Sequence, residues 1–407
     1  MKRHLLFWVA IIGLYACNNH QATKEIKVNN TVSFNYKDSL DQLLSKEYKK
    51  GHLPGFALAV FTTDSIYFSK GYGYADKAQQ KRMNDQTVQG IASISKTLIA
   101  VSLMKAVEEN LMNLDDPINE LLPFEVTHPN YKEVPITIRQ LATHTSSISD
   151  EGNYDKAYIF QELINKKQFP EVWGKYIDIY NANKDMPMKT FLKKVFDKES
   201  DWVTDKNFIA AKPGTQYEYS NIGAALLAHC IELKTGKDYR IITKELILQP
   251  LQMHRSGWSM DEVDQKNHIT YYNEIYNPVP PYHCTTYPDG GLFTSVQDLI
   301  KFLQEMMKGY YGKGNLLSTA SYQEMMKNQI PELDAPTGII WDMDNDCCIG
   351  HGGNDFGVAT MMYFNPDNGI GKILFTNIAL EKEELQDQFY TIFNKMFTYD
   401  KELEKNL

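Results

Sequence analysis

The sequence lacks an excess of positive charge, and it lacks any strong internal repeat. Its 407 residues contain 42 Lys and Arg against 51 Asp and Glu, a formal net charge of −9 at pH 7. A surface that neutralises nucleic-acid phosphates needs the opposite sign, so we expect no nucleic-acid partner. The composition, 43% hydrophobic and 12% aromatic, excludes disordered, collagenous and coiled-coil chains and indicates a globular protein with a large core.

Cysteine is scarce, and the patterns that hold metals are missing. The chain has five cysteines and ten histidines but neither a C-x-x-C pair nor an H-E-x-x-H motif, so we expect no metal site and no cofactor. Beyond the N-terminal segment lie Cys230, Cys284, Cys347 and Cys348, whose spacing allows several disulfide pairings. The adjacent Cys347 and Cys348 can bond to each other only with local strain, and the sequence leaves the state of all these thiols open.

The first 17 residues are organised like a secretion signal. A basic start at Lys2 and Arg3 precedes an apolar run and small residues before Cys17. The run is shorter than the roughly 20 residues that span a bilayer. Residues 14–17, LYAC, resemble the lipobox of bacterial lipoproteins, which implies that Cys17 carries a lipid anchor; an ordinary cleaved signal with an incidental cysteine is the alternative. We therefore expect a lipid-anchored protein of the bacterial cell envelope, facing the periplasm or the outer surface, with residues 18–34 as a flexible tether.

Strand-like and helix-like patterns divide the rest of the chain. Short β-branched and aromatic runs occur towards both ends, at 56–63, 65–75, 337–343, 357–365 and 371–378. Helical apolar spacing is found at 38–50, 93–110, most of 111–284 and 382–397, and Gly236 is predicted to end one of these helices. We infer that strands from both ends form one sheet, that the helical middle is an insertion packed against it, and that the functional site lies in the cleft between them.

The first candidate motif is S-x-x-K, formed by Ser93 and Lys96 at the start of a predicted helix. At this spacing their Cβ atoms lie about 5–6 Å apart on one helix face, so the amine can accept or guide the proton of a nucleophilic hydroxyl. The helix N-terminus adds backbone N–H groups for developing negative charge. A solvated helix start fits the same residues, and Ser95 is a rival nucleophile, although no lysine follows it three residues on.

The second candidate motif is Y-x-N, formed by Tyr219 and Asn221 in the stretch KPGTQYEYSN. Two residues apart on a loop, a phenol and an amide can point the same way. The phenol would serve as base or proton relay, and the amide would hold a substrate carbonyl or the lysine. The alternative makes Tyr219 a core aromatic and places Asn221 in the N-cap of the next helix.

The third candidate motif is the stretch Gly350, His351, Gly352, Gly353 and Asn354 before an apolar strand. The glycines would let a substrate backbone approach the strand edge, and the histidine could donate a hydrogen bond or shuttle a proton. The Asn354 N–H could supply half of an oxyanion hole. The alternative is a glycine-rich turn with a solvent-facing histidine.

The three motifs occur together and in this order, and from about residue 36 to 396 the chain resembles the serine β-lactamase and penicillin-recognising family. The resemblance is to its class C β-lactamase branch, with D-aminopeptidase, DD-peptidase and esterase relatives. The motifs of Ser93, Tyr219 and His351 stand at the family's S-x-x-K, Y-x-N and K-T-G (often H-x-G) positions. The stretches LATHTSSI, GGLFTSVQDLIKFL and GHGGNDFG match supporting parts of the family pattern.

This resemblance implies a fold of the α+β class. We expect the β-lactamase or penicillin-binding-protein-like arrangement, an antiparallel sheet flanked by helices with an all-helical subdomain. One catalytic domain would cover residues 35–400. Its α/β part would comprise about 35–110 and 285–400, and its helical subdomain about 111–284.

The resemblance also implies a covalent acyl-enzyme mechanism. Ser93 would attack an ester or amide carbonyl while Lys96 and Tyr219 share its proton and return it to the leaving group, after which water deacylates the enzyme. Asn221 would orient Lys96 and the substrate carbonyl. The N–H groups of Ser93 and Asn354 would form the oxyanion hole. Which group is the effective base depends on packing, which the sequence leaves open.

Departures from the family pattern bear on the substrate. The family's β-lactamases grip a carboxylate with an ammonium and a threonine hydroxyl at the third motif, where this chain has His351 and Gly352. We therefore expect a peptidase or esterase acting on a small-molecule or peptide substrate, D-amino-acid peptides included, rather than an efficient β-lactamase. A catalytically idle relative that binds cell-wall fragments or a protein partner is the alternative. The oligomeric state stays open.

Two further features of the sequence concern the rim of the site. Ser147 stands where the family usually has glycine. The segment 150–189 is rich in aromatic residues and lies in the part of the family that varies most. It either forms a lid over the substrate or packs the helical subdomain, since buried aromatics dominate cores.

Overall fold

The computed structural model describes residues 35–343 and 347–405. Within them, seven strands form one antiparallel sheet in the order β3-β2-β1-β11-β10-β9-β8. The strands are β1 Gly55–Phe61, β2 Ile66–Asp76, β3 Lys81–Arg82, β8 Asp342–Met343, β9 Ile349–Asp355, β10 Val358–Asn365 and β11 Ile370–Thr376. At the centre of the sheet β1 pairs with β11, with Leu58 opposite Leu374. The two ends of the chain therefore combine in one sheet, as predicted.

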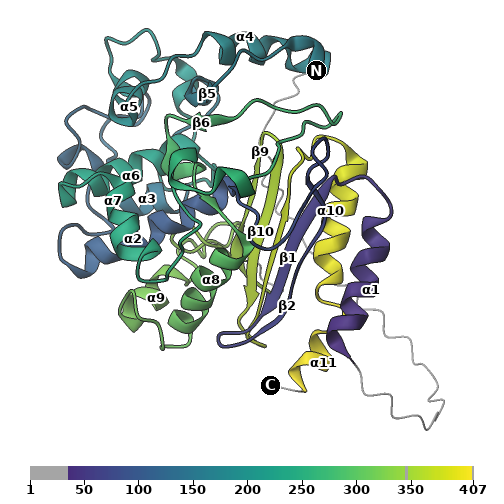
Figure 1. Cartoon of the computed structure of the whole chain (residues 1–407). Helices are drawn as coiled ribbons and strands as arrows, with labels where there is room; N and C mark the ends of the chain where they lie inside the picture. The colour runs from purple at the N-terminus through teal and green to yellow at the C-terminus, as the bar shows by residue number, and fades with distance from the viewer. Residues whose placement is uncertain (1–34, 344–346, 406–407) are drawn as a thin grey trace.

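The central strands β1 and β11 are buried on both faces, and their apolar sequences GFALAVF and IGKILFT explain this. Alternate residues of β1 enter two different cores, Ala57, Ala59 and Phe61 on one face and Phe56, Leu58 and Val60 on the other. This follows from the two-residue period of a strand. The second face is covered by helices from the chain ends, α1 Tyr36–Tyr48, α10 Glu383–Lys395 and α11 Asp400–Glu404, with α1 and α10 beside the sheet in Figure 1.

The first face of the sheet carries the remaining helices. They are α2 Lys96–Glu108, α3 Ile138–Ala142, α4 Gly174–Ala182, α5 Met188–Phe196, α6 Asn221–Thr235, α7 Tyr239–Thr243, α8 Val296–Tyr310 and α9 Thr319–Met325. Helix α6 packs against α2, α3 and α5, and its run NIGAALLAHCI is buried throughout. A helix that is apolar on all sides belongs in a core. It ends at Gly236, whose φ of 68° is the left-handed cap predicted from the sequence.

The structure confirms the α+β class and the antiparallel sheet flanked by helices. It differs from the prediction in one strand and in the middle of the chain. The strand expected at 337–343 is reduced to β8, Asp342–Met343. The middle of the chain is less helical than expected, because it contains long irregular segments and the short pair β5 Tyr158–Phe160 and β6 Tyr282–Cys284. The domain limits stay predictions. The signal, Cys17 and the tether lie outside the described residues.

The cysteines form one bonded pair and two free thiols. Cys347 and Cys348 are joined to each other by a disulfide directly before β9. Cys230 in α6 and Cys284 in β6 are free and buried. Burial raises the pKa of both thiols, so they behave as small apolar side chains rather than nucleophiles.

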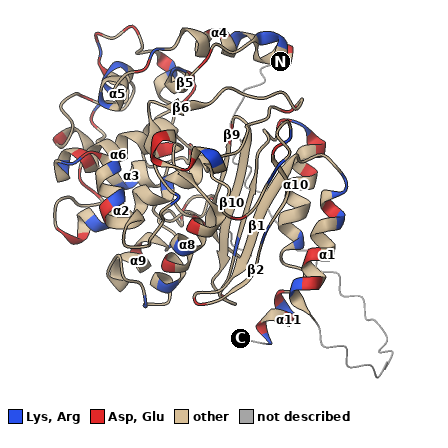
Figure 2. Ribbon diagram, in the orientation of Figure 1, with Lys and Arg blue, Asp and Glu red and all other residues tan. Residues whose placement is uncertain are grey.

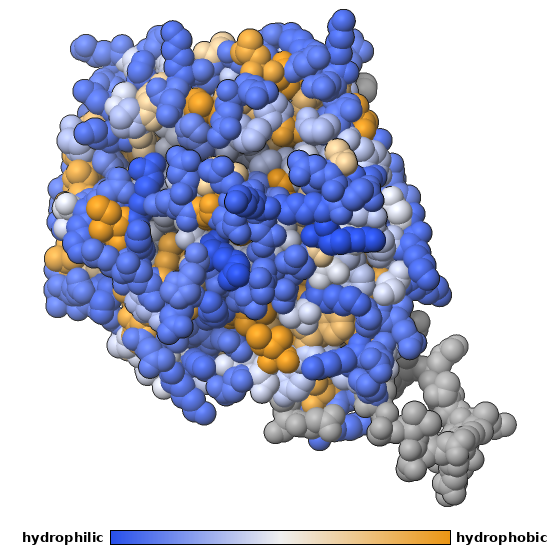
Figure 3. All heavy atoms as spheres, viewed as in Figure 1, coloured by the Kyte–Doolittle hydropathy of each residue, from blue (hydrophilic) through white to orange (hydrophobic). Residues whose placement is uncertain are grey.

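Charged residues lie mainly on helices and loops, with both signs mixed, while the sheet is largely free of them (Figure 2). Figure 3 shows one face of the molecule as mostly hydrophilic, with apolar residues in separate patches. Scattered apolar patches of this kind are normal for a globular surface. In the part of the chain that the structure describes, no helix is both long and apolar enough to cross a membrane.

Candidate active site

Ser93 and Lys96 meet where a 3-10 turn, Ala92–Ser95, continues into helix α2. The Lys96 Nζ donates hydrogen bonds to Ser93 Oγ at 3.0 Å and to the backbone carbonyl of Asp289 at 2.5 Å. Lys96 is fully buried, with 0% of its surface exposed. The amine therefore lies within proton-transfer distance of the hydroxyl, as the spacing predicted.

The turn that presents Ser93 is strained at the preceding residue. Ala92 has a φ of 47°, a left-handed conformation that costs a non-glycine residue about 1–2 kcal/mol. Neighbouring elements fix Ile91 just before it. Thr360 Oγ1 donates to the Ile91 carbonyl at 3.0 Å, and the Ile91 N–H donates to the Leu292 carbonyl at 3.0 Å. Such strain persists where the surroundings determine the backbone, which is common at functional sites.

Ser95, the rival nucleophile in the sequence, has a structural role. It is 0% exposed, and its Oγ accepts a hydrogen bond from the Leu292 N–H at 3.1 Å. Ser93 lines the pocket between the sheet and the helical part, and Ser95 does not. Of the two serines, Ser93 is the one that a substrate can reach.

Burial and the surrounding carboxyl groups shift the pKa of Lys96 in opposite directions, and the effect of burial is the larger. Burial lowers the pKa of Lys96, while the carboxyl groups of Asp289, Asp150 and Asp355 act in the opposite direction. Burial raises the pKa of Asp289 to about 7, and the nearby Lys96 charge opposes that rise. Lowering the pKa of a lysine increases the fraction present near neutral pH as the free amine, which is the form that can accept a proton.

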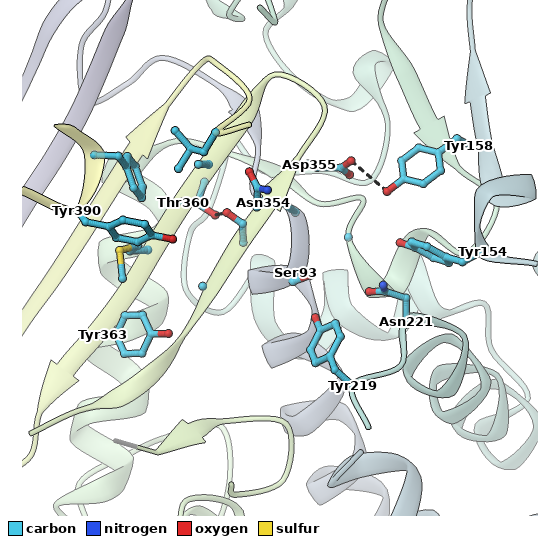
Figure 4. Close-up of a pocket in the computed structure, with 18 residues that line it drawn as sticks. Ser93, Tyr154, Tyr158, Tyr219, Asn221, Asn354, Asp355, Thr360, Tyr363 and Tyr390 are labelled. Carbon is cyan, nitrogen blue, oxygen red and sulfur yellow. Dashed lines mark hydrogen bonds between the residues drawn. The ribbon is translucent and has the colours of Figure 1, made fainter. Parts of the chain in front are cut away.

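Tyr219 lies beside both members of the first motif. The Lys96 Nζ is 5.1 Å from the centroid of its ring, and in Figure 4 the Tyr219 hydroxyl points towards Ser93. Burial raises the pKa of this phenol well above its usual value, and the Ser93 hydroxyl opposes the rise. The hydroxyl makes no hydrogen bond of good geometry with any described residue. A neutral phenol with spare bonding capacity can relay a proton between serine, lysine and substrate.

Asn221 begins helix α6, and its side chain binds a carboxylate rather than the lysine. Its Nδ2 donates to Asp150 Oδ2 at 2.8 Å, and the Asn221 backbone N–H donates to the same oxygen at 2.8 Å. The other oxygen accepts the Ile222 N–H at 3.0 Å and the Ser220 hydroxyl at 3.1 Å. Asp150 thus caps the positive end of the helix. The predicted contact of Asn221 with Lys96 is not among these bonds.

The glycines of β9 bring this strand against the turn of Ser93. A Cβ at Gly353 would lie 2.4 Å from the Ile91 carbonyl oxygen and 3.1 Å from the Ser93 nitrogen, so only glycine permits this approach. Gly352, Gly353 and Asn354 line the same pocket as Ser93. Figure 4 shows Ser93 and Asn354 at this pocket. The two residues predicted to supply oxyanion-hole N–H groups, Ser93 and Asn354, therefore border one space.

His351 also lies on β9, but it is 0% exposed and does not line the pocket. Its Nδ1 is 2.5 Å from the Gly352 carbonyl oxygen, and because a carbonyl can only accept, Nδ1 carries the proton. Burial lowers the pKa of the imidazole, so the ring is neutral at pH 7. Its centroid is 6.4 Å from that of Tyr219. The alternative of a solvent-facing histidine does not hold, and His351 can influence the site through Tyr219.

A family model supplies independent evidence on what this arrangement is. The model described as Beta-lactamase matches residues 40–395, a span that contains all three motifs. The chain belongs to the Beta-lactamase family. The resemblance predicted from the motifs is therefore confirmed.

A curated relative of this chain is distant in sequence. Protein flp of Staphylococcus aureus (strain MW2) is 23% identical over 348 residues, which are 84% of this chain and 63% of that protein. The chain therefore spans less than two thirds of the length of the curated relatives it first matches.

Solved structures show the same fold. A penicillin-binding protein homologue from Pyrococcus abyssi, described as octameric, superposes with a TM-score of 0.67 at 24% identity over 84% of this chain and 73% of that chain. A class C beta-lactamase gives 0.64 at 19% identity, covering 88% and 95%. The D-amino acid amidase from Ochrobactrum anthropi SV3, solved with L-phenylalanine amide, gives 0.62 at 19% identity, covering 89% and 98%. At these identities the likeness establishes the fold alone.

Ser147 departs from the Beta-lactamase family pattern at a position where the backbone favours glycine. Its φ is 65°, in the left-handed region. The Ser147 Oγ donates to the Ala211 carbonyl at 2.8 Å, and the Ser147 carbonyl accepts the Ile209 N–H at 2.9 Å. These bonds hold the serine in a conformation that glycine would adopt without strain.

Sequence reasoning missed three carboxyl groups of this site, Asp289 and Asp355 in addition to Asp150. Asp289 holds Lys96 through its carbonyl, and its Oδ1 accepts the Tyr154 hydroxyl at 2.8 Å. Asp355 Oδ1 accepts the Tyr158 hydroxyl at 3.1 Å (Figure 4), and burial raises the pKa of this carboxyl to about 6. The tyrosines are 135 and 197 residues from their partners, so no local spacing could indicate these contacts.

A second cavity of about 760 Å³ adjoins the Ser93 pocket. Both are lined by Tyr154, Tyr219, Asn221, Asn354 and Asp355. The aromatic segment 150–189 contributes Trp173 and Tyr180, which are buried and also line the second cavity. The segment therefore packs against the core and also forms part of the cavity wall. The volume lies within the range of about 300–1,000 Å³ that is usual for small-ligand sites.

Proposed function

We propose that the protein is a serine hydrolase that cleaves an ester or amide through an acyl-enzyme on Ser93. The observation that carries this proposal is the fully buried amine of Lys96, 3.0 Å from the Ser93 hydroxyl, with a pKa that burial lowers. Groups with shifted pKa values that lie in a cleft are characteristic of catalytic sites. The hydroxyl beside the amine is a nucleophile that needs such a base.

The reaction would proceed in two halves. The Ser93 oxygen attacks the substrate carbonyl while its proton passes to Lys96, directly or through the Tyr219 hydroxyl. The N–H groups of Ser93 and Asn354 stabilise the oxyanion, each worth about 10²–10³ in rate. The proton then moves to the leaving group as the carbonyl bond to it breaks. A water molecule cleaves the resulting ester by the reverse use of the same groups, and the free acid departs.

The substrate class that we favour is an ester or amide of an amino acid or peptide rather than a β-lactam. At the third motif His351 is neutral and lies outside the pocket lining, and Gly352 has no hydroxyl. This edge therefore offers no permanent positive charge to a substrate carboxylate. A D-amino acid amidase solved with L-phenylalanine amide shares this fold, and so does a class C beta-lactamase, so the preference rests on the third motif.

The test is covalent labelling of the full chain in detergent with a fluorophosphonate, followed by intact mass measurement. We expect one adduct per chain on the wild type and none on Ser93→Ala. Ser95→Ala is the matched control, since Ser95 Oγ only holds the Leu292 N–H, and it should be labelled like the wild type. A folded wild type that takes no adduct between about pH 6 and 9 would contradict the proposal and favour the binding-protein alternative.

A further inference from the structure

The second cavity has an unbalanced charge. Its lining contains the carboxylates Asp150, Glu151, Asp155, Glu218, Glu274, Asp355 and Glu381 but only the lysines Lys175 and Lys206. Lys206 is already neutralised by Glu151, at 2.8 Å. Asp150 and Asp355 are engaged by the N–H and hydroxyl groups described above. The remaining acids leave the cavity with a surplus of negative charge.

Glu274 is the acid in this cavity that most needs a cation. It is 5% exposed, and its Oε1 accepts a hydrogen bond from the Trp173 indole N–H at 2.8 Å. This is its only side-chain hydrogen bond, and it has no ion pair, within residues 35–343 and 347–405. A carboxylate can accept several hydrogen bonds, and a buried charge is normally paired. The free oxygen of Glu274 therefore has capacity for a positively charged ligand.

A second carboxylate strengthens the negative potential at the same place. Glu381, in the loop between β11 and α10, lines the cavity with Glu274. Desolvation and the neighbouring Glu274 carboxylate raise the pKa of Glu381. The charge of Lys175 acts on another carboxyl group of this cavity, because it opposes the rise in the pKa of Asp155, and its ammonium lies 4.5 Å from the Tyr176 ring centroid. A cation bound beside Glu274 and Glu381 would offset the repulsion between these two carboxyl groups.

Aromatic rings form the rest of this wall. Trp173 and Phe356 pack with their centroids 5.3 Å apart, and Tyr176 and Tyr180 stack with theirs 6.5 Å apart. All of them line the cavity. Aromatic rings beside a carboxylate suit an alkylammonium, because they contact its carbon chain and a ring face attracts positive charge, as Tyr176 does with Lys175. A neutral or anionic group gains less from such a wall.

We propose that this cavity is a substrate subsite for a primary ammonium group, bound by Glu274 with Glu381 beside it. The proposal rests on the hydrolase function proposed for Ser93, and it names the substrate class. The cavity shares Tyr219, Asn221 and Asn354 with the pocket of Ser93, so a substrate whose carbonyl lies at the serine extends directly into it. The ammonium comes either from an α-amino group or from the end of a side chain, and chain length distinguishes the two.

The experiment uses p-nitrophenyl esters that differ only at the far end. At pH about 7 the full-length protein is assayed with esters ending in ammonium, methyl or carboxylate, on chains from an α-amino acid to 8-aminooctanoate. A charge-assisted hydrogen bond in a buried site predicts a kcat/KM for the best ammonium ester about 10-fold to 100-fold above its methyl isostere. The carboxylate series should be the poorest. The chain length with the largest ratio identifies the source of the ammonium.

The deciding variant is Glu274→Gln, whose amide oxygen can still accept the Trp173 bond. We expect its ammonium-to-methyl ratio to fall to near parity, while Glu332→Gln, an exposed carboxylate that lines neither cavity, keeps the wild-type ratio. Circular dichroism and thermal unfolding establish that each variant is folded. Equal kcat/KM for ammonium and methyl esters in the wild type, or a preference that survives in Glu274→Gln, would overturn the subsite.

A binding measurement separates this proposal from that of the hydrolase. Calorimetric titration of Ser93→Ala with hexylammonium needs no turnover, and we expect binding that Glu274→Gln weakens about 10-fold or more. If the wild type hydrolyses no ester but this binding is found, the hydrolase proposal fails and the ammonium site stands. If esters are hydrolysed but hexylammonium does not bind, or only Ca²⁺ binds at Glu274, the ammonium site fails.

Discussion

Lys372 and Lys96 are both buried, at 1% and 0% exposure, but the two regions hold them differently. On the face of the sheet that carries the terminal helices, Lys372 of β11 pairs with Asp400 of α11 at 2.7 Å. In the cleft, Lys96 has no ion pair among the residues described and donates to the Ser93 hydroxyl and the Asp289 carbonyl. Burial lowers the pKa of both ammonium groups.

The two lysines have different bonding partners, and this difference distinguishes a structural charge at Lys372 from a reactive one at Lys96. Asp400 neutralises Lys372 and ties α11 to the sheet, which is what a buried ion pair can do. The acceptors at Lys96 are uncharged, so they position the amine without fixing its proton. An amine held in this way changes its protonation state more easily than one that is paired with a carboxylate. The comparison predicts opposite consequences when each lysine is removed.

Lys96→Met should have the largest effect on chemistry. We expect fluorophosphonate labelling of Ser93 to slow by about 10²–10⁴-fold, because the serine loses its general base. Stability should change little, since the variant removes a buried charge that lacks an ion pair. The labelling rate by intact mass and the thermal unfolding by circular dichroism measure the two quantities. Labelling at the wild-type rate would exclude Lys96 as the base and leave Tyr219.

Lys372→Met should have the opposite effects, a large loss of stability and no change in chemistry. We expect the free energy of unfolding to fall by about 3–5 kcal/mol, because Asp400 remains buried without its partner. The labelling rate of the folded protein should not change. Urea denaturation measures the loss, and the double variant Lys372→Met/Asp400→Leu should recover most of it. If the double variant were as unstable as the single one, lost packing rather than an unpaired charge would be the cause.

The part of the site that depends on local spacing could be predicted from the sequence. Ser93 and Lys96 lie three residues apart at a helix start, where spacing alone brings their side chains together. The cap at Gly236 and the apolar runs that form the strands near the chain ends are local in the same sense. The local sequence makes Tyr219 and His351 candidates, but only the family's motif order joins them to Ser93, because nothing near either residue indicates that their rings lie 6.4 Å apart.

The rest depends on long-range contacts that leave no sequence pattern. Asn221 was expected to hold Lys96, but it binds Asp150, 71 residues away. The carbonyl that holds Lys96 belongs to Asp289, 193 residues away, and a backbone carbonyl is the same in every residue type. The unpaired carboxylate of Glu274 shows the same limit, since only the folded cavity distinguishes it from a solvated acid.

Asp289→Asn is the mildest test of the contrast between the two lysines, because it keeps the backbone carbonyl on Lys96 and removes only a nearby charge. Burial raises the pKa of Asp289 to about 7, so the wild-type carboxyl is neutral below that pH and negative above it. Its negative form raises the pKa of Lys96 and so delays loss of the lysine proton. Without that charge, Lys96 should lose its proton at lower pH. The rising limb of the labelling rate, measured between about pH 5 and 10, should therefore move to lower pH, with the two proteins differing most above about pH 7.

Asp400→Asn, which changes the charge beside the other lysine, should leave this limb in place. A shift to higher pH in Asp289→Asn, or an equal shift in both variants, would show that the charges around Lys96 do not control its proton.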